Sequence, residues 1–244
     1  MRSTSVCTCY AKQLLHGNGD LTAKISIAKN KIYQDALIVD IADELKDNTD
    51  MLDIGAHIGL VSIGVDMIRQ TKDNTFHCIE PYIENLTHLK NNIGTKDNFF
   101  TYHCALGSYI HFDNLNSNPY GIGESYIARI WEDGDKHIFI PTINLDYISN
   151  KFPRVNVVKI GCPKSVRDIL SGATKFLMKN KPVVYIYRDD DQMEFRIINS
   201  LLETVGYKFS KFLSYEYAKF IHTGSEEYPC ETTDSKFQRN ISKQ

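Results

Sequence analysis

The chain has 244 residues, of which 42% are hydrophobic and 24% are charged, and its formal net charge is -2. This length and composition suit a single α/β domain with a full core. The near-neutral charge gives no electrostatic footprint for nucleic acid, and no apolar run approaches the roughly 20 residues that span a bilayer. The N-terminal stretch lacks the continuous apolar core of a secretory signal, so we expect a cytoplasmic protein.

The first expected elements lead up to a glycine turn. Residues 21–27 alternate apolar and polar side chains, which predicts a strand, and residues 33–46 place apolar side chains at near-helical spacing. We expect that helix to cover one edge of a sheet. Residues 1–48 then form an N-terminal extension with a cover helix, residues 49–222 form the α/β domain, and residues 223–244 form a polar, loose tail.

The stretch Asp50–Arg69 organises the rest of the chain. Residues 51–54 predict a short buried strand, residues 55–59 a tight glycine turn, and residues 60–68 the apolar start of a helix. Glycine at such a turn lets backbone N–H groups approach a ligand and permits the dihedral angles that a side chain forbids. The Gly-x-x-x-Gly spacing differs from the usual dinucleotide fingerprint, and the Lys and Ser/Thr of a P-loop are absent.

The second predicted strand, residues 76–79, ends in Glu80. An acid roughly 20 residues or more beyond a glycine loop is the expected acceptor for ribose hydroxyls in a nucleotide-binding α/β unit. Alternating strands and helices predict a parallel sheet, whose carboxyl edge would carry Asp53, Glu80 and Cys104-Ala105. A simpler interpretation, with turn glycines, a helix-start acid and a small core residue, stays open.

The second half of the chain continues the alternation after an irregular stretch. Residues 109–112 and 137–140 predict a hairpin around an aromatic-rich loop, residues 114–134, which is either a substrate lid or a surface excursion. The remaining elements are expected in this order: a short helix over 142–148, a strand over 155–160, a helix that follows residue 164 and runs through 178, a strand over 182–187 and a helix over 189–205. A sixth strand then begins at 206, and a seventh, over 215–221, pairs antiparallel with it.

Several of these residues resemble a known family. The sequence DIGAHIG, from Asp53 to Gly59, is similar to the first motif of class I S-adenosylmethionine-dependent methyltransferases, in particular the Asp-Val-Gly-Ala-Asn-Ile-Gly form of FkbM-like methyltransferases. Further matches keep the family's order: Glu80-Pro81, Asn85, Leu89, Ala105-Leu106-Gly107, Thr142 to Asp146, Ile169 to Ala173 and Val205-Gly206-Tyr207. The resemblance covers about residues 50–212 and implies a Rossmann-like fold, a seven-stranded, mostly parallel sheet with helices on both faces.

The chain departs from the family at the end of the fourth strand. There the family has Lys-Ile-Asp-Val-Glu-Gly, whereas residues 159–164 read KIGCPK, so both acids are absent. A carboxylate at that place orients a substrate hydroxyl, takes its proton or holds a metal ion. The motifs expected to bind the cofactor are therefore present, whereas the motif expected to carry catalysis is altered. The loss of both acids also argues against a bound divalent metal.

The resemblance implies which residues would form the site. The residues that would bind S-adenosylmethionine are Asp53, Gly55, Ala56, His57, Gly59, Glu80, Pro81, Cys104 and Ala105. The candidate catalytic residues near the strand ends are His57 and Asp146, with Lys159 as an electrostatic partner. For His103, another histidine near a strand end, a structural role is the favoured interpretation. No metal ligands are predicted.

Two functions from different classes follow. The first is an S-adenosylmethionine-dependent O-methyltransferase that acts on a sugar or another small hydroxylated acceptor. The alternative is a catalytically degenerate methyltransferase-fold protein with a binding or structural role, which the loss of both acids favours. A nucleic-acid methyltransferase is a weaker third interpretation because the chain has no basic stripe. The acceptor and the oligomeric state are left open.

Overall fold

The computed structural model describes residues 35–69, 73–116, 126–128, 137–162, 164–188, 191–213 and 216–224. The strand expected over 21–27, most of the expected N-terminal extension, most of the aromatic-rich loop and nearly all of the expected tail lie outside these residues.

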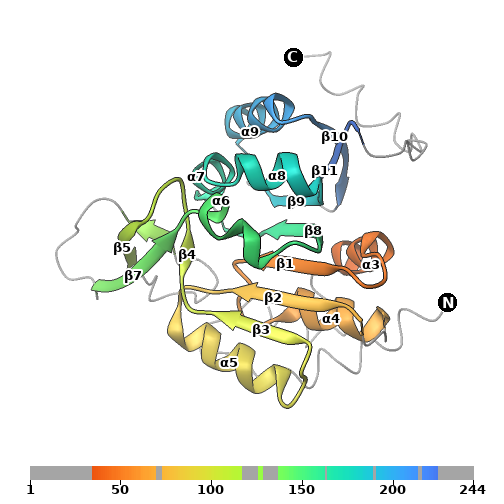
Figure 1. Cartoon of the computed structure of the whole chain (residues 1–244). Coiled ribbons are helices and arrows are strands. Elements are labelled where there is room, and N and C mark those ends of the chain that lie inside the picture. Colours follow the sequence, from red (N-terminus) through yellow and green to blue (C-terminus); the bar gives the residue numbers. More distant parts are fainter. Residues whose placement is uncertain are drawn as a thin grey trace.

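The described part of the chain alternates helices and strands (Figure 1). Its helices are α3 (Asp35–Glu44), α4 (Leu60–Arg69), α5 (Ile83–Ile93), α6 (Leu145–Ile148), the 3-10 helix η2 (Ser149–Lys151), α7 (Val166–Ser171), α8 (Thr174–Asn180) and α9 (Gln192–Thr204). Its strands are β1 (Asp50–Ile54), β2 (Thr75–Ile79), β3 (Phe99–Tyr102), β4 (Ala105–Leu106), β5 (His111–Asn116), β6 (Tyr126–Ala128), β7 (His137–Ile143), β8 (Val155–Ile160), β9 (Val183–Tyr187), β10 (Tyr207–Leu213) and β11 (Tyr217–His222).

Seven strands form one sheet in the order β10-β11-β9-β8-β1-β2-β3. The pairs β1–β2, β1–β8, β2–β3 and β8–β9 are parallel, and β11 runs antiparallel to both of its neighbours, β9 and β10. The prediction of a seven-stranded, mostly parallel sheet is therefore confirmed. The antiparallel pairing of the last two strands is confirmed as well.

Helices pack on both faces of this sheet and create two separate cores. On one face α3, α4 and α5 cover side chains such as Met51, Phe76 and Val157. On the other face α6 to α9 cover Leu52, Val158 and Ile186. All five residues of β1 are buried, as expected for a central parallel strand between two helical layers. None of the helices that the structure describes is long and apolar enough to cross a membrane.

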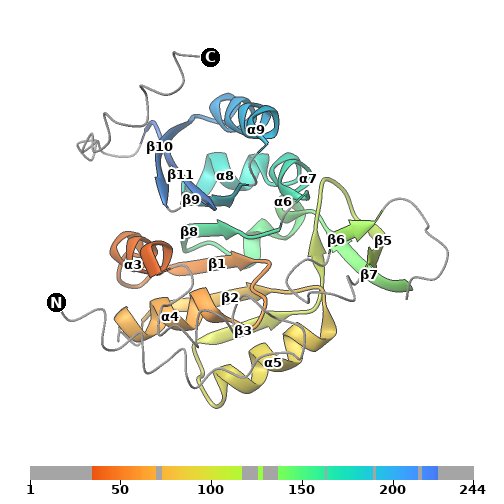
Figure 2. The same cartoon turned by 180° about the vertical axis from the view of Figure 1, so that it is seen from behind.

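A second sheet with the order β4-β7-β5-β6 stands off the large sheet (Figures 1 and 2). The predicted hairpin is confirmed as the antiparallel pair β5–β7, and β6, from within the expected loop, adds to β5. The chain enters this sheet directly after β3, at the carboxyl edge of the large sheet. Whether the rest of the loop acts as a lid stays a prediction, because it lies outside the described residues.

Two predicted helices differ from the structure. The helix predicted over 142–148 is wrong at its start: Thr142 and Ile143 belong to β7, where they pair with Ala105 and Leu106 of β4. The helix predicted from 164 through 178 is interrupted at Gly172 and forms α7 and α8 instead. A side chain at Gly172 would collide with the backbone carbonyl of Gly107, the residue after β4, so close packing at this point requires a glycine.

Candidate functional site

The glycine turn between β1 and α4 is held in an unusual backbone conformation. Gly55, His57 and Gly59 all have positive φ angles, of 72°, 54° and 89°. A Cβ on Gly55 would lie 2.6 Å from Cys162 Sγ, and one on Gly59 would lie 2.5 Å from a methyl group of Leu89. Both positions therefore require glycine for the dihedral angle and for the space.

The first three backbone N–H groups of the turn are hydrogen-bonded within the protein and are not available to a ligand. The N–H groups of Gly55 and Ala56 both donate to the carbonyl of Ile79, at 2.9 and 3.0 Å. The N–H of His57 donates to Glu80 Oε2 at 2.8 Å. The turn is thus fixed before any ligand arrives, and its bonds join the end of β1 to the end of β2.

Glu80 is the residue that joins these two strand ends. Besides His57, its carboxylate accepts from the Tyr82 N–H at 3.0 Å and from Asn85 Nδ2 at 3.2 Å. Only 5% of Glu80 is exposed, and burial raises the pKa of its carboxyl group above the ordinary value even though these donors lower it. A carboxylate has roughly four acceptor positions, so the three donors described here leave room for a ligand hydroxyl.

A buried ion pair lies beneath the turn. Asp53 is 0% exposed; its Oδ1 is 2.9 Å from Lys159 Nζ, and its Oδ2 accepts from the Ser62 hydroxyl at 2.6 Å. Lys159 Nζ also donates to the carbonyl of Gly55 at 2.7 Å. Burial lowers the pKa of Lys159, but Asp53, Tyr217 and Cys162 together outweigh burial and raise this pKa above the ordinary value, so the ammonium keeps its charge. Lys159 therefore acts as an anchor for the turn and not as a base.

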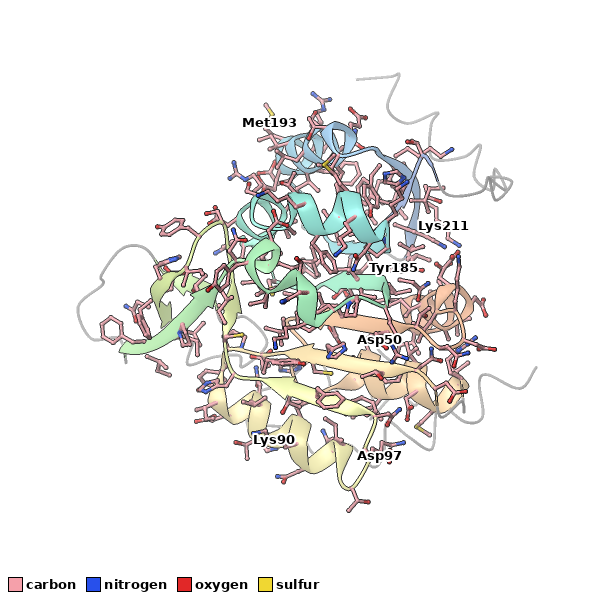
Figure 3. All side chains as sticks on the ribbon, in the orientation of Figure 1. Asp50, Lys90, Asp97, Tyr185, Met193 and Lys211 are labelled. Carbon is pink, nitrogen blue, oxygen red and sulfur yellow. The ribbon has the colours of Figure 1, made fainter. Side chains whose placement is uncertain are left out.

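This ion pair belongs to a row of polar side chains that crosses the α3–α5 face of the sheet. In the strand register Cys78 lies beside Asp53, Asp53 beside Lys159, Lys159 beside Tyr185, and Tyr185 beside Lys219. Neighbouring positions in register point to the same face of a sheet. The row ends beside α3, where Lys219 and the Tyr185 hydroxyl both bond to Asp40 (Tyr185 is labelled in Figure 3).

At the carboxyl end of β8, Gly161 stands at the first position where an acid was expected, and Pro163, at the second, lies outside the described residues. The N–H of Gly161 donates to the Ile54 carbonyl at 2.8 Å, which places this segment directly beside the glycine turn. A Cβ on Gly161 would collide with the Lys159 side chain, 2.6 Å from its Cε, and would lie 3.0 Å from the hydroxyl of Tyr217, so this position has no room for a side chain. Burial raises the pKa of the Cys162 thiol to about 12.

The predicted catalytic residues do not gather at one point. Asp146 accepts from the backbone N–H groups of Lys175 and Phe176, at 3.0 and 2.8 Å, and so caps the start of α8. His57 and Lys159 both lie at the turn, His57 through its backbone N–H and Lys159 through its ammonium. His103 Nε2 lies 3.1 Å from the Pro81 carbonyl. The catalytic role of Asp146 stays a prediction, and the capping bonds give it a structural role.

The residues predicted to flank the cofactor's base lie beyond β3. Cys104 is buried in the core beneath α6 to α9, and burial raises its pKa to about 11. Ala105 opens β4 of the second sheet and is buried with Leu115 and Ile140. Pro81 follows Glu80 just after β2. Pro81, Cys104 and Ala105 therefore all lie at the carboxyl edge of the large sheet.

Sequence reasoning missed two residues that belong to this site. Ser62 holds Asp53 from the first turn of α4, and Tyr217 reaches the Gly161 position from β11. Ser62 follows Gly59 by three residues, a spacing that places it on the first helical turn beside the strand end. Tyr217 carries no such local signal because its contact depends on the antiparallel placement of β11.

Comparisons with known proteins settle the fold. No model of a known protein family matches the sequence, and no curated protein matches it. Among solved structures the chain is similar to methyltransferase FkbM from Methylobacillus flagellatus KT, with a TM-score of 0.52 and 16% identity over 91% of this chain and 59% of that one. This chain therefore spans less than two thirds of the length of the FkbM structure. The fold is that of the class I methyltransferases.

A second solved structure has the same fold and a different description. A putative RNA methyltransferase from Pyrococcus horikoshii matches with a TM-score of 0.51 and 13% identity, over 93% of this chain and 100% of that one. At identities this low, the likeness to either protein establishes the architecture and leaves the acceptor to be argued from the site. Within the described residues, no group of three or more His, Cys, Asp and Glu side chains is arranged to hold a metal ion.

Proposed function

We propose that this protein is an S-adenosylmethionine-dependent O-methyltransferase whose cofactor site is the glycine turn, residues 55–59, together with Glu80. The observation that carries the proposal is the buried Glu80 carboxylate, which the turn itself holds through the His57 N–H. A buried acid at the end of the second strand is the group that recognises ribose hydroxyls in nucleotide-binding α/β folds. The class I methyltransferase fold supports the same assignment.

The residues at the turn fit such a cofactor. Glu80 would accept from the ribose hydroxyls, and the bare Cα atoms of Gly55 and Gly59 would let the methionine part lie against the backbone. Asp53 has both oxygens engaged, so we assign it an indirect role: it holds Lys159, which holds the Gly55 carbonyl. Cys104 and Ala105 would flank the adenine. When bound, the cofactor supplies a methyl group on a sulfonium.

The protein's contribution to methyl transfer would be mainly positional. Transfer from a sulfonium needs an acceptor atom aligned with the methyl group, and alignment alone supplies much of the rate. We infer that residues 49–222 form the methyltransferase domain, with residues 1–48 as an extension and residues 223–244 as a tail. The acceptor class implied by the resemblance is a small hydroxylated molecule such as a sugar. The acceptor would bind where β8 ends and β11 begins.

A degenerate, non-catalytic protein is the second candidate. It is favoured by Gly161 and Pro163, which stand where the resembled family has acids. It is also favoured by Lys159, whose ammonium is already paired with the buried Asp53 carboxylate. In this alternative the fold would bind S-adenosylmethionine, or another ligand, without turning it over.

Formation of S-adenosylhomocysteine from S-adenosylmethionine tests the first candidate. Wild-type protein is incubated with a panel of sugars, other alcohols and carboxylic acids, beside an Asp53→Ala/Glu80→Ala variant and a Glu203→Ala control on the exposed face of α9. We expect turnover in the wild type and the control and its loss in the double variant. Turnover that persists unchanged in the double variant would refute the assigned site. Cofactor binding without turnover of any acceptor would favour the degenerate protein.

A further inference from the structure

The two oxygens of the Glu80 carboxylate have different surroundings. Oε1 accepts from two donors, the Tyr82 N–H at 3.0 Å and Asn85 Nδ2 at 3.2 Å. Oε2 accepts from one donor, the His57 N–H at 2.8 Å. A carboxylate oxygen has about two acceptor positions. The described residues therefore fill both positions on Oε1, and they fill one of the two on Oε2.

Of these three donors, the Asn85 amide is the one that belongs to a side chain. Asn85 lies in the first turn of α5 and is 3% exposed. Further along the same helix, a methyl group of Leu89 would lie 2.5 Å from a Cβ on Gly59. Asn92 Nδ2 donates to the Ile58 carbonyl at 2.9 Å. These contacts hold α5 against the glycine turn, so the helix itself places the Asn85 amide beside Oε1.

The bond from Asn85 also favours the charged form of Glu80. Burial raises the pKa of this carboxyl group, whereas its three hydrogen-bond donors and the charge of Lys159 lower the same pKa. A hydroxyl donates a stronger hydrogen bond to an ionised carboxylate than to a neutral group. Loss of the Asn85 amide would thus weaken the acceptor as well as turn it.

The carboxylate of Glu80 lies nearer the surface than the ion pair beneath the turn. Glu80 is 5% exposed and Asp53 is 0% exposed. His57, Pro81 and Tyr82, which adjoin the carboxylate, are half-buried. A cofactor that lies on the glycine turn would therefore meet Oε2, the oxygen that the turn itself holds through a backbone N–H.

We propose that Asn85 is a positioning residue of the cofactor site: its amide occupies Oε1 of Glu80 and leaves Oε2 to accept a ribose hydroxyl. This inference rests on the proposed methyltransferase function and deepens it, because it names the oxygen that recognises the cofactor and the side chain that sets this choice. Glu80 then bonds to one of the two ribose hydroxyls and not to both. Asn85 acts through Glu80 and does not touch the cofactor.

Calorimetry with the wild-type protein tests how many hydroxyls Glu80 accepts. The full chain is titrated with S-adenosylhomocysteine and with its 2′-deoxy and 3′-deoxy analogues, each of which lacks one ribose hydroxyl. We expect one analogue to bind at least about ten-fold more weakly than the parent compound, and the other to stay within about three-fold of it. Similar losses for both analogues, or no loss for either, would overturn the inference.

The pH dependence of binding tests the role of Asn85. Asn85→Leu removes the donor with little change in size, which raises the pKa of Glu80, so its affinity for S-adenosylhomocysteine should recover as the pH rises. Asn85→Asp places a second carboxyl group beside Oε1. While the two acids share one proton, the new carboxyl group can donate to Oε1, but at higher pH both are ionised and repel each other. The affinity of Asn85→Asp should therefore recover as the pH falls.

Affinities are compared with the wild type at each pH, from about pH 6 to about pH 8.5, which cancels the titration of the ligand. The matched control is Asn199→Asp, because Asn199 Nδ2 also donates to a carboxylate, Glu203 Oε1 at 2.7 Å, on the exposed face of α9. This control should follow the wild type throughout.

Opposite pH trends in Asn85→Leu and Asn85→Asp would support the inference. Parallel trends in the two variants, or affinities equal to the wild type, would overturn the inference and leave the proposed function standing. If neither variant folds, the two deoxy analogues decide the inference on the wild-type protein. A failure of S-adenosylhomocysteine to bind the wild type at any pH would overturn the proposed function and this inference with it.

Discussion

Two lysines are buried on the same face of the large sheet, and each stabilises a different part of the fold. Lys159 is 4% exposed and binds one carboxylate, Asp53, and one backbone carbonyl, that of Gly55. Lys219 is 5% exposed and binds two carboxylates, Asp40 at 2.7 Å and Glu44 at 2.6 Å, both from α3. The first lysine fixes a turn that a ligand would contact, and the second fixes a helix to the sheet.

The difference shows that a buried charge does not by itself mark a functional site. Around Lys219 the network is self-contained: the Tyr185 hydroxyl donates to Asp40 at 2.7 Å, and Lys211 pairs with the same carboxylate. Around Lys159 the bonded groups end at Gly55, which is half-buried. The two lysines differ in what they hold in place: Lys159 fixes the backbone of the glycine turn at the carboxyl edge of the sheet, whereas Lys219 fixes α3.

Removal of Lys159 should have the largest effect. Lys159→Met leaves the Asp53 carboxylate buried without its partner, and we expect the free energy of unfolding to drop by about 3–5 kcal/mol in urea titrations. The affinity for S-adenosylmethionine should fall at least ten-fold, because the Gly55 carbonyl loses its donor.

A double variant separates the two effects. Lys159→Met/Asp53→Leu removes both charges, and we expect it to regain most of the stability while the cofactor affinity stays low. Recovery of wild-type affinity in the double variant would show that Lys159 contributes to folding alone, which would erase the difference between the two lysines.

Removal of Lys219 should affect stability only. Lys219→Met removes the lysine partner of Glu44, but Asp40 keeps Lys211 and the Tyr185 hydroxyl, and water reaches both carboxylates partly. We therefore expect a smaller loss, of about 2 kcal/mol. Cofactor affinity measured on the folded protein should equal that of the wild type. A ten-fold weaker affinity would mean that the anchor of α3 also shapes the turn.

The same contrast shows how far the sequence could lead. Local patterns were sufficient for β1, the glycine turn and β8, because apolar runs and glycines act within a few residues. They could not give the partner of Lys159 or the position of Tyr217, since both depend on strand order across the sheet. Asp146 lies in a family-like motif, and the structure adds a role that the motif does not indicate: its oxygens cap α8, which begins just after Gly172.

Acid should weaken the helix anchor. Burial raises the pKa of Asp40, but Lys211, Lys219 and Tyr185 outweigh it and lower the pKa below the ordinary value of 3.8. A carboxyl group with a lowered pKa contributes stability above its unfolded-state pKa, and that contribution is lost as the pH falls through the folded-state pKa. The free energy of unfolding should therefore decline below about pH 4, and less steeply in Asp40→Asn. Equal slopes in both proteins would contradict the assignment.

The smallest effect is expected at Asp146. Asp146→Ala removes the acceptor for two N–H groups at the start of α8, and we expect a loss of about 1 kcal/mol in unfolding free energy, typical of a helix cap. Urea titration measures it. A loss of turnover much larger than the unfolded fraction accounts for would instead restore the catalytic prediction for this residue.

Calorimetric titration with S-adenosylmethionine, for wild type, Glu80→Ala and the Glu203→Ala control, tests the central claim most directly. The assigned site predicts binding to the wild type and to Glu203→Ala, and an affinity at least ten-fold weaker in Glu80→Ala, because the buried acceptor for the ribose hydroxyls is gone. Absence of heat in the wild type, with no thermal shift on addition of the cofactor, would contradict the claim that the glycine turn and Glu80 form a cofactor site.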